Sequence, residues 1–433
     1  MTSATDIPLL EKMPGHGRIR AQYLLESGTD PAHAAAVMAG EQSSGTFTKL
    51  AQETAELTER CGARIESLQE IEGLPRASLP IHGKLGGPTR RAVVEISWGM
   101  DNFGASLANL MATVAGNLFE LKEVAGLRLL DIDLPDAFAQ RYLPPRFAVA
   151  GTRELLGVHG GGPLVGTIIK PSVGLSPAQT AENVRALCEG GIDFIKDDEL
   201  QSDGAHCPFD ERVEAVMRVI DAYAERTGKK PMYAFNVTGD MDEMRRRHDT
   251  VLRHGGTCVM ISLNSVGLVA AHQLRTFSQL PIHGHRNGWG YLSRHPALGF
   301  EYSAWQKFWR LAGVDHMHVN GLRNKFSETD ESVIRSARTC MTPMFARPLP
   351  GFEAMPVFSS GQWAGQAFET YERLRTVDLI YAAGGGIMAH PGGIAAGIES
   401  IRTAWEAAAR GVGIEQAARE SKALAQAIAF FGK

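Results

Sequence analysis

Four consecutive charged residues, Lys196-Asp197-Asp198-Glu199, follow a short apolar run that is typical of a β-strand. Because side chains alternate along a strand, Lys196 and Asp198 share one face, and Glu199 at the strand end can turn toward the same point. Two carboxylates around one point suggest a hard cation such as Mg²⁺, which prefers oxygen ligands, but an ammonium group beside them would repel it. Addition of CO2 to the neutral amine of Lys196 would give a carbamate and a third anionic ligand. A lysine held in salt bridges is the structural alternative.

The residues before this motif predict a strand and a helix that position it. The first apolar run, 164–169, stops at Lys170-Pro171. Ser176-Pro177, with Gln179 three residues after Ser176, predicts a helix start with a capping box. Gly190-Gly191 ends that helix, and a second strand over 192–195 leads into the charged motif.

From Pro163 onward, apolar strands and amphipathic helices alternate through the rest of the chain. We expect strands near Val165, Phe194, Tyr233, Val259, Ile282, Met317, Val357 and Ile380. The intervening helices include residues 209–227, 240–254, 302–311 and 393–409. Eight strand–helix units in roughly 250 residues are typical of a (β/α)8 TIM barrel, whose chemistry lies at the C-terminal ends of its strands.

The preceding part of the chain has a different order of elements. We expect strands over 19–25, 63–71, 91–96 and 127–132, and helices over 31–40 and 103–115. This βαββαβ order favours a ferredoxin-like α+β sandwich. A stretch rich in Pro and Gly, 134–162, is a plausible connection between domains. We therefore predict an α/β protein with an N-terminal ferredoxin-like domain, 1–145, and a C-terminal barrel domain, 146–433.

Composition excludes several classes of protein. The chain has 433 residues, is 44% hydrophobic and carries a formal charge of −4, which is ordinary for a globular protein and gives no bias toward nucleic acid. Its five cysteines are scattered without metal-site spacing, as expected in a reducing compartment. The N-terminus lacks the pattern of a signal peptide, and no stretch approaches the ~20 apolar residues of a membrane span. We expect a cytoplasmic protein that does not bind a membrane.

Two His-x-His pairs, His283/His285 and His316/His318, lie at the ends of the fifth and sixth expected barrel strands. Imidazoles are common Zn²⁺ ligands, so a binuclear hydrolase with a bridging carbamylated lysine is an alternative. The order of the motifs argues against this alternative. Metal-dependent amidohydrolases have a different arrangement, with the His-x-His pair on strand one and the bridging lysine on strand four, whereas the lysine here is on strand two. We expect His283 and His316 to be hydrogen-bonded barrel residues.

Glycine-containing turns follow the last two expected strands, as Ser359-Ser360-Gly361 and Gly384-Gly385-Gly386. Loops at this place in a barrel commonly cradle a phosphate with their backbone amides. Glycine also merely permits tight turns, which is the structural alternative.

The stretches GTIIKPSVGL and GGIDFIKDDE, in this order and spacing, resemble two signatures of the ribulose-1,5-bisphosphate carboxylase/oxygenase (RuBisCO) large-subunit superfamily. The resemblance implies that Lys196 is carbamylated and that Asp198 and Glu199 bind one Mg²⁺ ion. It implies that Lys170 acts on the enolate carbon. Catalytic or substrate- and phosphate-binding roles are implied likewise for His285, Arg286, His318, Lys325, Ser359, Gly361, Gly384 and Gly385. Taken alone, Arg286 and Lys325 could be surface charges.

The resemblance extends to the N-terminal stretch GEQSSGTFT and to VAGNLFEL. Glu41, Thr46 and Asn117 match residues that complete the active site of the neighbouring subunit in the family, and Phe47 stands where the carboxylase has tryptophan. This implies a homodimer with shared active sites, with further assembly left open. Read without the family, Glu41 is equally a solvated helix-end charge and Asn117 a turn residue.

Departures from the family pattern concern the carboxylation chemistry. Ser172 replaces the second lysine of the KPK motif, the loop NGLRNKFSE lacks the Gly-rich lead-in to its lysine, and Ser360 replaces a glycine. A carboxylase must bind CO2 against an enediolate and protonate a carbanion, so we expect no net carboxylation. The chain resembles the RuBisCO-like, or form IV, branch.

Two reactions reach the enediolate that such a site stabilises: proton removal and loss of CO2 from a 3-oxo acid. The stretches HGHRNGWG and HVNGLRNKF resemble RuBisCO-like proteins of bacterial sugar-acid catabolism. The resemblance implies decarboxylation of 3-oxo-isoapionate 4-phosphate to L-erythrulose 1-phosphate and CO2. The alternative is an enolase or isomerase of a methylthio-sugar phosphate in methionine salvage, which should need an apolar pocket. A degenerate scaffold is a third possibility, and the retained Lys170, Lys196 and His285 argue against it.

Overall fold

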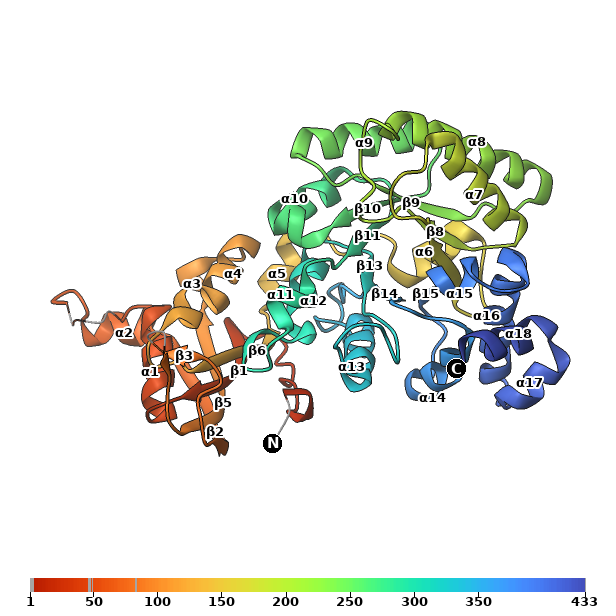
Figure 1. The fold of residues 1–433 in the computed structure, drawn as a ribbon. Coiled ribbons are helices and arrows are strands. Elements are labelled where there is room, and N and C mark those ends of the chain that lie inside the picture. The colour runs from red at the N-terminus through yellow and green to blue at the C-terminus, as the bar shows by residue number, and fades with distance from the viewer. Residues whose placement is uncertain (1–3, 46–47, 49, 82–83, 433) are drawn as a thin grey trace. The chain divides into compact units, whose positions relative to one another are not determined.

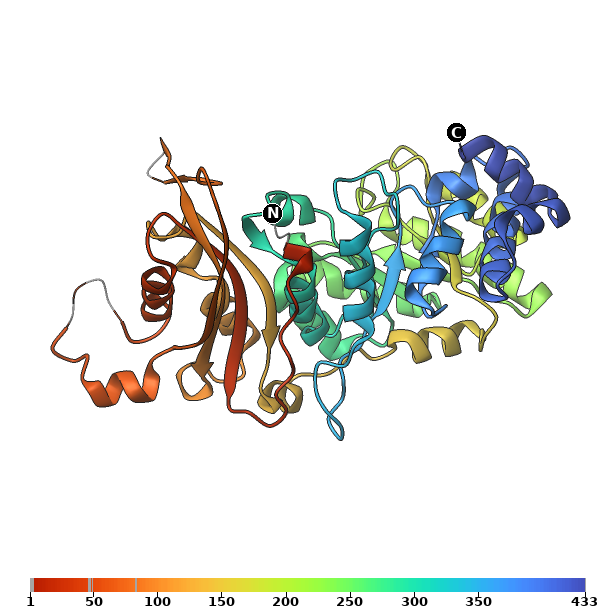
Figure 2. The ribbon, with the colours of Figure 1, turned by 90° about the horizontal axis from the view of Figure 1, so that it is seen from below.

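The computed structural model of the chain describes residues 4–45, 48, 50–81 and 84–432. The chain divides into two compact units, each built from more than one segment. Unit 1 comprises Met1–Pro144, Gly288–Ala312 and Thr342–Phe352, and unit 2 comprises Pro145–Asn287, Gly313–Met341 and Glu353–Lys433. Figures 1 and 2 show the elements of each unit in two views.

Unit 1 contains a five-stranded sheet in the order β12-β6-β1-β5-β2. Its strands are β1 (Arg18–Ser27), β2 (Arg64–Leu74), β5 (Thr89–Gly99), β6 (Gly126–Asp133) and β12 (Leu298–Phe300). The β1–β5, β1–β6 and β2–β5 pairs are antiparallel, and the helices α1 (Pro31–Glu41) and α4 (Leu107–Ala115) connect the strands. The four strands predicted for this region are present, and their order is that of a ferredoxin-like sandwich, which confirms the predicted fold class.

Two features of unit 1 differ from the sequence-based expectation. The helix expected over 103–115 is two helices, because α3 (Met100–Phe103) ends at Gly104, whose φ of 63° is left-handed, and α4 starts anew at the cap Ser106. The short strand β12, which the sequence pattern did not reveal, adds to β6 in parallel. The following helix, α12 (Tyr302–Leu311), expected among the barrel helices, belongs to unit 1.

A buried ion pair connects the segment Gly288–Ala312, which carries β12 and α12, to strand β6 of unit 1. Arg128 on β6 donates from Nε to Glu301 at 2.6 Å, and both side chains are less than a tenth exposed. Lys307 on α12 reaches Asp131 on the same strand at 2.6 Å. Charges removed from water need such partners, so α12 is held against β6 by paired charges as well as by apolar packing.

Unit 2 is a closed barrel of eight parallel strands in the order β10-β11-β13-β14-β15-β7-β8-β9. The strands are β7 (Leu164–Ile168), β8 (Phe194–Lys196), β9 (Met232–Asn236), β10 (Cys258–Ser262), β11 (Ile282–His285), β13 (His316–His318), β14 (Met355–Phe358) and β15 (Ile380–Ala382). All eight strands lie where the sequence pattern predicted them, and the predicted TIM barrel is confirmed.

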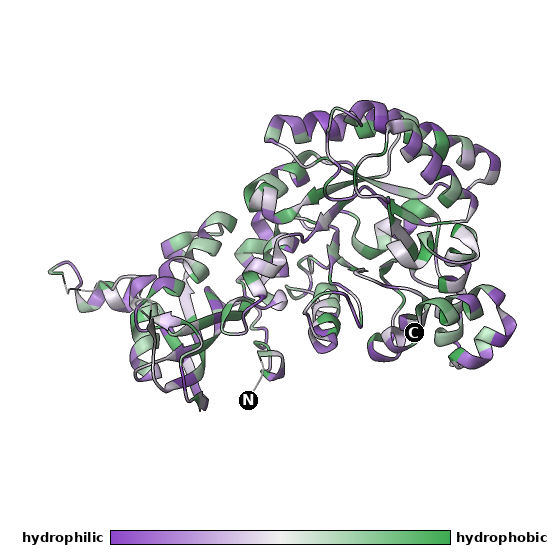
Figure 3. Ribbon diagram, viewed as in Figure 1, coloured by the Kyte–Doolittle hydropathy of each residue, from purple (hydrophilic) through white to green (hydrophobic). Residues whose placement is uncertain are grey.

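Helices surround this barrel. Those that follow the strands are α7 (Pro177–Glu189), α8 (Phe209–Thr227), α9 (Met241–Arg253), α10 (Leu263–Phe277), α13 (Asp330–Met341), α14 (Ala367–Leu374) and α16 (Gly393–Ala409). In Figure 3, α8 and α9 are largely hydrophilic, whereas the barrel strands are mostly hydrophobic. The capping box expected at α7 is present, because Gln179 N donates to Ser176 Oγ at 3.3 Å and Ser176 N donates to Gln179 Oε1 at 2.9 Å.

The remaining described elements are short. They are η1 (Ala4–Asp6), α2 (Ala55–Cys61), β3 (Pro80–Ile81), β4 (Lys84–Leu85), η2 (Asn117–Glu120), α5 (Asp136–Arg141), α6 (Ala148–Leu156), α11 (Trp289–Ser293), η3 (Ala364–Gln366), α15 (Gly384–Met388), α17 (Ile414–Glu420) and α18 (Lys422–Phe431). Within the described ranges, no helix has the length and apolar character that crossing a membrane requires.

Candidate active site

The strand β8 divides the charged motif between two faces of the barrel wall. Phe194 belongs to the apolar cluster of buried residues from β7, β9, β10, β14 and β15 that fills the barrel. Lys196 lies two residues further along β8, so its side chain shares the inward face at the C-terminal end, where it is 1% exposed. The alternation that predicted a shared face for Lys196 and Asp198 also sends Asp197 to the opposite face.

Charged groups from three strand ends meet beside Lys196. Lys170, after β7, donates from Nζ to Asp198 Oδ2 at 2.6 Å. Glu199 Oε2 lies 3.4 Å from Lys196 Nζ and 3.4 Å from Nε2 of His285, which ends β11. The structure therefore brings together five of the predicted site residues, from loops that are far apart in the sequence.

Burial influences the protonation of Lys196 and His285 in this cluster. It lowers the pKa of the Lys196 ammonium, although Glu199 and Asp198 act in the opposite direction. Burial, followed by the charge of Lys196, lowers the pKa of His285 to about 4, so the imidazole is neutral at neutral pH. Because Asn287 N donates to His285 Nδ1 at 3.2 Å, the ring hydrogen lies on Nε2 and points at Glu199.

The carboxylates beside Lys196 are candidate ligands for a divalent cation. Among the described residues, no group of three His, Cys, Asp or Glu side chains is spaced to hold a metal ion. Asp198 and Glu199 supply carboxylate oxygens, and Lys196 Nζ lies 3.4 Å from Glu199. Burial lowers the pKa of Lys196, which favours the neutral amine that reacts with CO2. These residues fit Mg²⁺ once the charge of Lys196 is reversed by carbamate formation.

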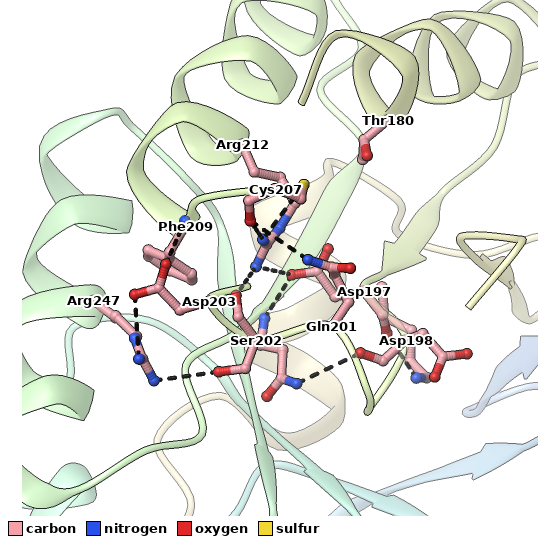
Figure 4. A network of polar contacts seen from close by, with 12 residues as sticks. Thr180, Asp197, Asp198, Gln201, Ser202, Asp203, Cys207, Phe209, Arg212 and Arg247 are labelled. Carbon is pink, nitrogen blue, oxygen red and sulfur yellow. Dashed lines mark hydrogen bonds and ion pairs between the residues drawn. The ribbon is translucent and has the colours of Figure 1, made fainter. Parts of the chain in front are cut away.

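Asp197 is held from the other side of the barrel wall by three donors, of which Arg212 is labelled in Figure 4. Tyr233 donates its hydroxyl to Asp197 Oδ1 at 2.6 Å, and Asn236 N donates to Oδ2 at 2.9 Å. The guanidinium of Arg212 on α8, which is fully buried, lies 3.2 Å from the same oxygen. Sequence reasoning did not identify this partner, because nothing in the local pattern relates Arg212 to Asp197.

The same arginine ties down the loop that carries the carboxylates. Arg212 donates to Ser202 O at 2.7 Å and to Cys207 O at 3.1 Å. At the end of β9, Asn236 Nδ2 donates to Glu199 O at 3.2 Å. Arg247 on α9 joins Ser202 Oγ at 3.2 Å, as Figure 4 also shows. The positions of Asp198 and Glu199 thus depend on contacts with α8, β9 and α9.

The two glycine-containing loops lie after β14 and β15, as expected. Lys325 N donates to Ser360 O at 3.2 Å, which places the loop of Lys325 against the turn before Gly361. Gly361 has a φ of +89°, a conformation that favours glycine. A Cβ atom added at Gly385 would meet nothing within 4 Å, and one at Gly384 would meet only Ile168, at 3.7 Å. Backbone amides with open space beside them are suited to an anionic ligand.

Hydrogen bonds and an ion pair connect the remaining predicted residues of unit 2 to β11 and to the loops after β13 and β14. His318 Nδ1 lies 3.0 Å from Ser359 Oγ, and His283 Nε2 lies 2.7 Å from His318 Nε2. Arg286 forms an ion pair with Glu328, which the sequence analysis had not singled out. His316 Nε2 bonds Thr152 Oγ1 at 2.8 Å, so the expectation that His283 and His316 are hydrogen-bonded barrel residues is confirmed.

The predicted site residues of unit 1 form a separate pair. Asn117 donates from Nδ2 to Glu41 Oε1 at 3.0 Å, and both residues are exposed. Thr46 and Phe47 lie outside the described residues. The pairing of Glu41 with Asn117, 76 positions apart, explains how two separate stretches can contribute to one surface.

Comparisons with known proteins cover both units. Residues 148–431 match the family described as ribulose bisphosphate carboxylase large chain, catalytic domain, and residues 13–138 match its N-terminal domain. A 3-oxo-isoapionate-4-phosphate transcarboxylase/hydrolase of Xanthobacter autotrophicus is 57% identical over 96% of this chain and 99% of that protein. A 3-oxo-isoapionate-4-phosphate decarboxylase of Rhizobium rhizogenes is 44% identical over 91% of this chain and 94% of that protein. The crystal structure of a rubisco-like protein from Burkholderia fungorum is similar with a TM-score of 0.90 and 47% identity, over 96% of this chain and all of that one.

Proposed function

The chain belongs to the ribulose bisphosphate carboxylase large-chain family, and we propose that it is a RuBisCO-like carboxy-lyase of a phosphorylated sugar acid. The proposed reaction converts 3-oxo-isoapionate 4-phosphate into L-erythrulose 1-phosphate and CO2. Relatives at 57% and 44% identity carry the name of this substrate, which supports the choice. The observation that carries the proposal is the position of Lys170 Nζ, which lies 2.6 Å from Asp198 and 2.9 Å from the hydroxyl of Ser172.

Some of the site residues bind the metal ion or the substrate, and Lys170 transfers a proton. Mg²⁺, held by Asp198, Glu199 and the carbamate of Lys196, would supply the positive charge that stabilises the enolate oxygen developing as CO2 leaves. The amides around Gly361, Gly384 and Gly385 hold the phosphate at the other end of the substrate. Lys170 donates its proton to the enediolate carbon that has lost the carboxylate, which completes the decarboxylation.

Ser172 explains why the reaction runs toward loss of CO2. Its hydroxyl accepts a hydrogen bond from Lys170 Nζ at 2.9 Å, so a neutral group stands where the carboxylases of the family have a second lysine. A second ammonium would attract a carboxylate product or a partially negative oxygen atom of incoming CO2. With a neutral neighbour, Lys170 is the one cation of the β7 loop that faces the enediolate, and its proton quenches that intermediate.

A second candidate is a transcarboxylase/hydrolase, which the relative at 57% identity favours. Such an enzyme must break the same bond to the carboxyl group. It would then return the CO2 to a different carbon of the enediolate before water cleaves the product. The two candidates differ in the fate of the carboxyl carbon and share the residues that release it.

We propose further that two chains form a homodimer with shared active sites. Family membership supports this arrangement, and so does the exposed pair of Glu41 and Asn117 in unit 1. In that dimer, Glu41, Thr46 and Asn117 of one protomer would complete the site at the barrel of its partner.

The experiment that separates the candidates uses substrate labelled with ¹³C in its carboxyl group and follows the label by NMR. We expect the label in CO2 and bicarbonate, with unlabelled L-erythrulose 1-phosphate in equal amount. Label retained in an organic product would identify the transcarboxylase. No conversion, together with proton exchange on a methylthio-sugar phosphate, would overturn both in favour of the isomerase. The Lys196→Ala variant controls for spontaneous decarboxylation.

A further inference from the structure

Six side chains of unit 2 form a continuous hydrogen-bonded chain from the barrel core to the loop of Lys325. In order they are His283, His318, Ser359, Ser360, Asn320 and Glu328. We propose that Glu328 and His283 fix the direction of every bond in this chain, so that Ser359 presents its hydroxyl hydrogen to the substrate phosphate. This role rests on the phosphate site of the proposed function.

The direction is set at the Glu328 end. An ionised carboxylate can only accept hydrogen bonds, so the 2.7 Å contact with Glu328 Oε2 comes from Nδ2 of Asn320. The amide orientation that this requires leaves Asn320 Oδ1 as an acceptor. Ser360 therefore donates its one hydroxyl hydrogen to that oxygen, at 2.8 Å. Ser332 also donates to Glu328, at 2.8 Å, and Arg286 forms an ion pair with the same carboxylate.

The direction then passes through the two serines. Ser360 has used its hydrogen on Asn320, so the 3.4 Å contact between the serine oxygens requires Ser359 to be the donor. Ser359 also has only one hydrogen. Its 3.0 Å contact with His318 must therefore be accepted, which assigns the hydrogen of His318 to Nδ1.

The histidines complete the chain. Burial lowers the pKa of both His283 and His318, so each ring is neutral and carries a single N–H. With its hydrogen on Nδ1, His318 accepts at Nε2, and His283 donates from Nε2 across 2.7 Å. His283 Nδ1 has no hydrogen-bond partner among the described residues, which agrees with a bare nitrogen there, because a buried N–H would be left unsatisfied.

The longest hydrogen bond of the series, between Ser359 and Ser360, lies where the substrate would bind. The exposed fraction of the side chains rises along the hydrogen-bonded series from 0% at His283 to 3% at His318 and 6% at Ser359, which follows the end of β14. A phosphate oxygen can replace the long contact to Ser360 without reversing any other bond. With the opposite tautomer of His318, Ser359 would donate to the ring and present lone pairs to the anion. His283 is therefore a positioning residue that acts through His318.

Backbone geometry supports the importance of the Ser360–Asn320 contact. Both residues have left-handed φ angles, 71° and 65°, although neither is glycine. Such conformations persist where surrounding contacts determine them, and they gather at functional sites. Here Ser359 N donates to Asn320 O at 3.2 Å, and the side chains of Ser360 and Asn320 bond each other. These contacts hold the loop after β13 and the loop after β14 in fixed positions relative to each other.

The test measures binding of inorganic phosphate to the Mg²⁺-loaded enzyme by calorimetry, with three variants. His283→Met removes the donor, and we expect phosphate to bind about ten- to hundredfold more weakly, as for loss of a hydrogen bond to a charged group. His283→Gln retains a donor at the place of Nε2 and should restore most of the affinity. His316→Met is the matched control, because His316 is equally buried but hydrogen-bonds to Thr152, which is not one of the six connected side chains. Equal weakening in both methionine variants, or unchanged affinity in His283→Met, would overturn the proposal.

A second readout needs no variant and no substrate. Long-range ¹H–¹⁵N spectra of the enzyme with ¹⁵N-labelled histidine distinguish the two neutral tautomers. We expect His318 as the Nδ1–H form and His283 as the Nε2–H form. The opposite assignment for either ring, or a charged ring at neutral pH, would refute the proposed direction. Neither readout depends on turnover. A negative result in the decarboxylation assay would therefore contradict the proposed function without contradicting the proposed hydrogen-bond direction.

Discussion

At the scale of single residues, the alternation of side chains along β8 separates chemistry from support. Lys196 points into the barrel mouth, and Asp198 and Glu199 lie beside it with Lys170 and His285. Asp197 points away and is held by Arg212. One strand end thus carries reactive groups on one face and their anchor on the other.

Lys196 is the residue on which the proposed metal site depends. We predict that Lys196→Ala abolishes both Mg²⁺ binding and turnover, since the third anionic ligand is lost. Binding is measured with Mn²⁺ by electron paramagnetic resonance, and turnover by CO2 release. Lys230→Ala is the control, because Lys230 forms only a partly exposed ion pair with Asp221. Normal activity in Lys196→Ala would refute the metal assignment.

Arg212 and Asp197 form a buried pair whose separation should be costly. We predict that Arg212→Met lowers the free energy of unfolding by about 3–5 kcal/mol, because Asp197 stays buried without its counter-charge. Urea denaturation measures the loss. The double variant with Asp197→Asn should lose less than the sum of the single variants, and strict additivity would show that the two residues are not coupled.

The sequence predicted the reactive face of this motif but not its support. Alternation along a strand is a local property, so it was enough to group Lys196 with Asp198, and the end of the strand allowed Glu199 to turn toward them. The partner of Asp197 comes from α8, fifteen positions later, and that of Arg286 from Glu328 in another loop. Such contacts depend on how helices and loops pack against the barrel, which one sequence does not specify.

At the scale of elements, strong local signals predicted most of the fold. The capping box of Ser176 and Gln179 marked the start of α7, and runs of apolar residues marked the eight barrel strands. The three-residue strand β12 was missed because it is too short to show a period of two. Its pairing with β6, more than 160 positions earlier, is a tertiary contact.

The cap of α7 provides a test at this scale. We predict that Ser176→Ala lowers the free energy of unfolding by about 1 kcal/mol, because the first turn loses an acceptor for Gln179 N. Ser176→Asp keeps an acceptor at the cap and should be nearly neutral. Both are compared with the native protein by urea denaturation. A similar loss in the two variants would show that the cap contributes nothing specific.

At the scale of the whole molecule, the chain passes between the two units several times. Segments Gly288–Ala312 and Thr342–Phe352 leave the barrel sequence and join unit 1. The barrel residues Lys196 and His285 and the unit 1 residues Glu41 and Asn117 therefore belong to different compact bodies. In the proposed homodimer, each active site draws on both kinds of unit.

Shared sites can be tested by complementation. We predict that Glu41→Gln and Lys196→Ala are each inactive alone but regain activity when co-expressed. Random pairing makes half of the dimers mixed, and each mixed dimer has one intact site, so about a quarter of native activity is expected. The measurement is CO2 release by the co-purified protein. If two affinity tags demonstrate mixed dimers but the co-purified protein remains inactive, the proposal of shared active sites is contradicted.

The central claim is decarboxylation at a site assembled from Lys170, a carbamylated Lys196, Asp198 and Glu199. It is tested most directly by CO2 release from 3-oxo-isoapionate 4-phosphate, with Mg²⁺ and bicarbonate each present or omitted. We predict release that requires Mg²⁺ and increases after preincubation with bicarbonate. Release that persists after Mg²⁺ is chelated, or no release by folded enzyme that binds Mg²⁺, would contradict the claim.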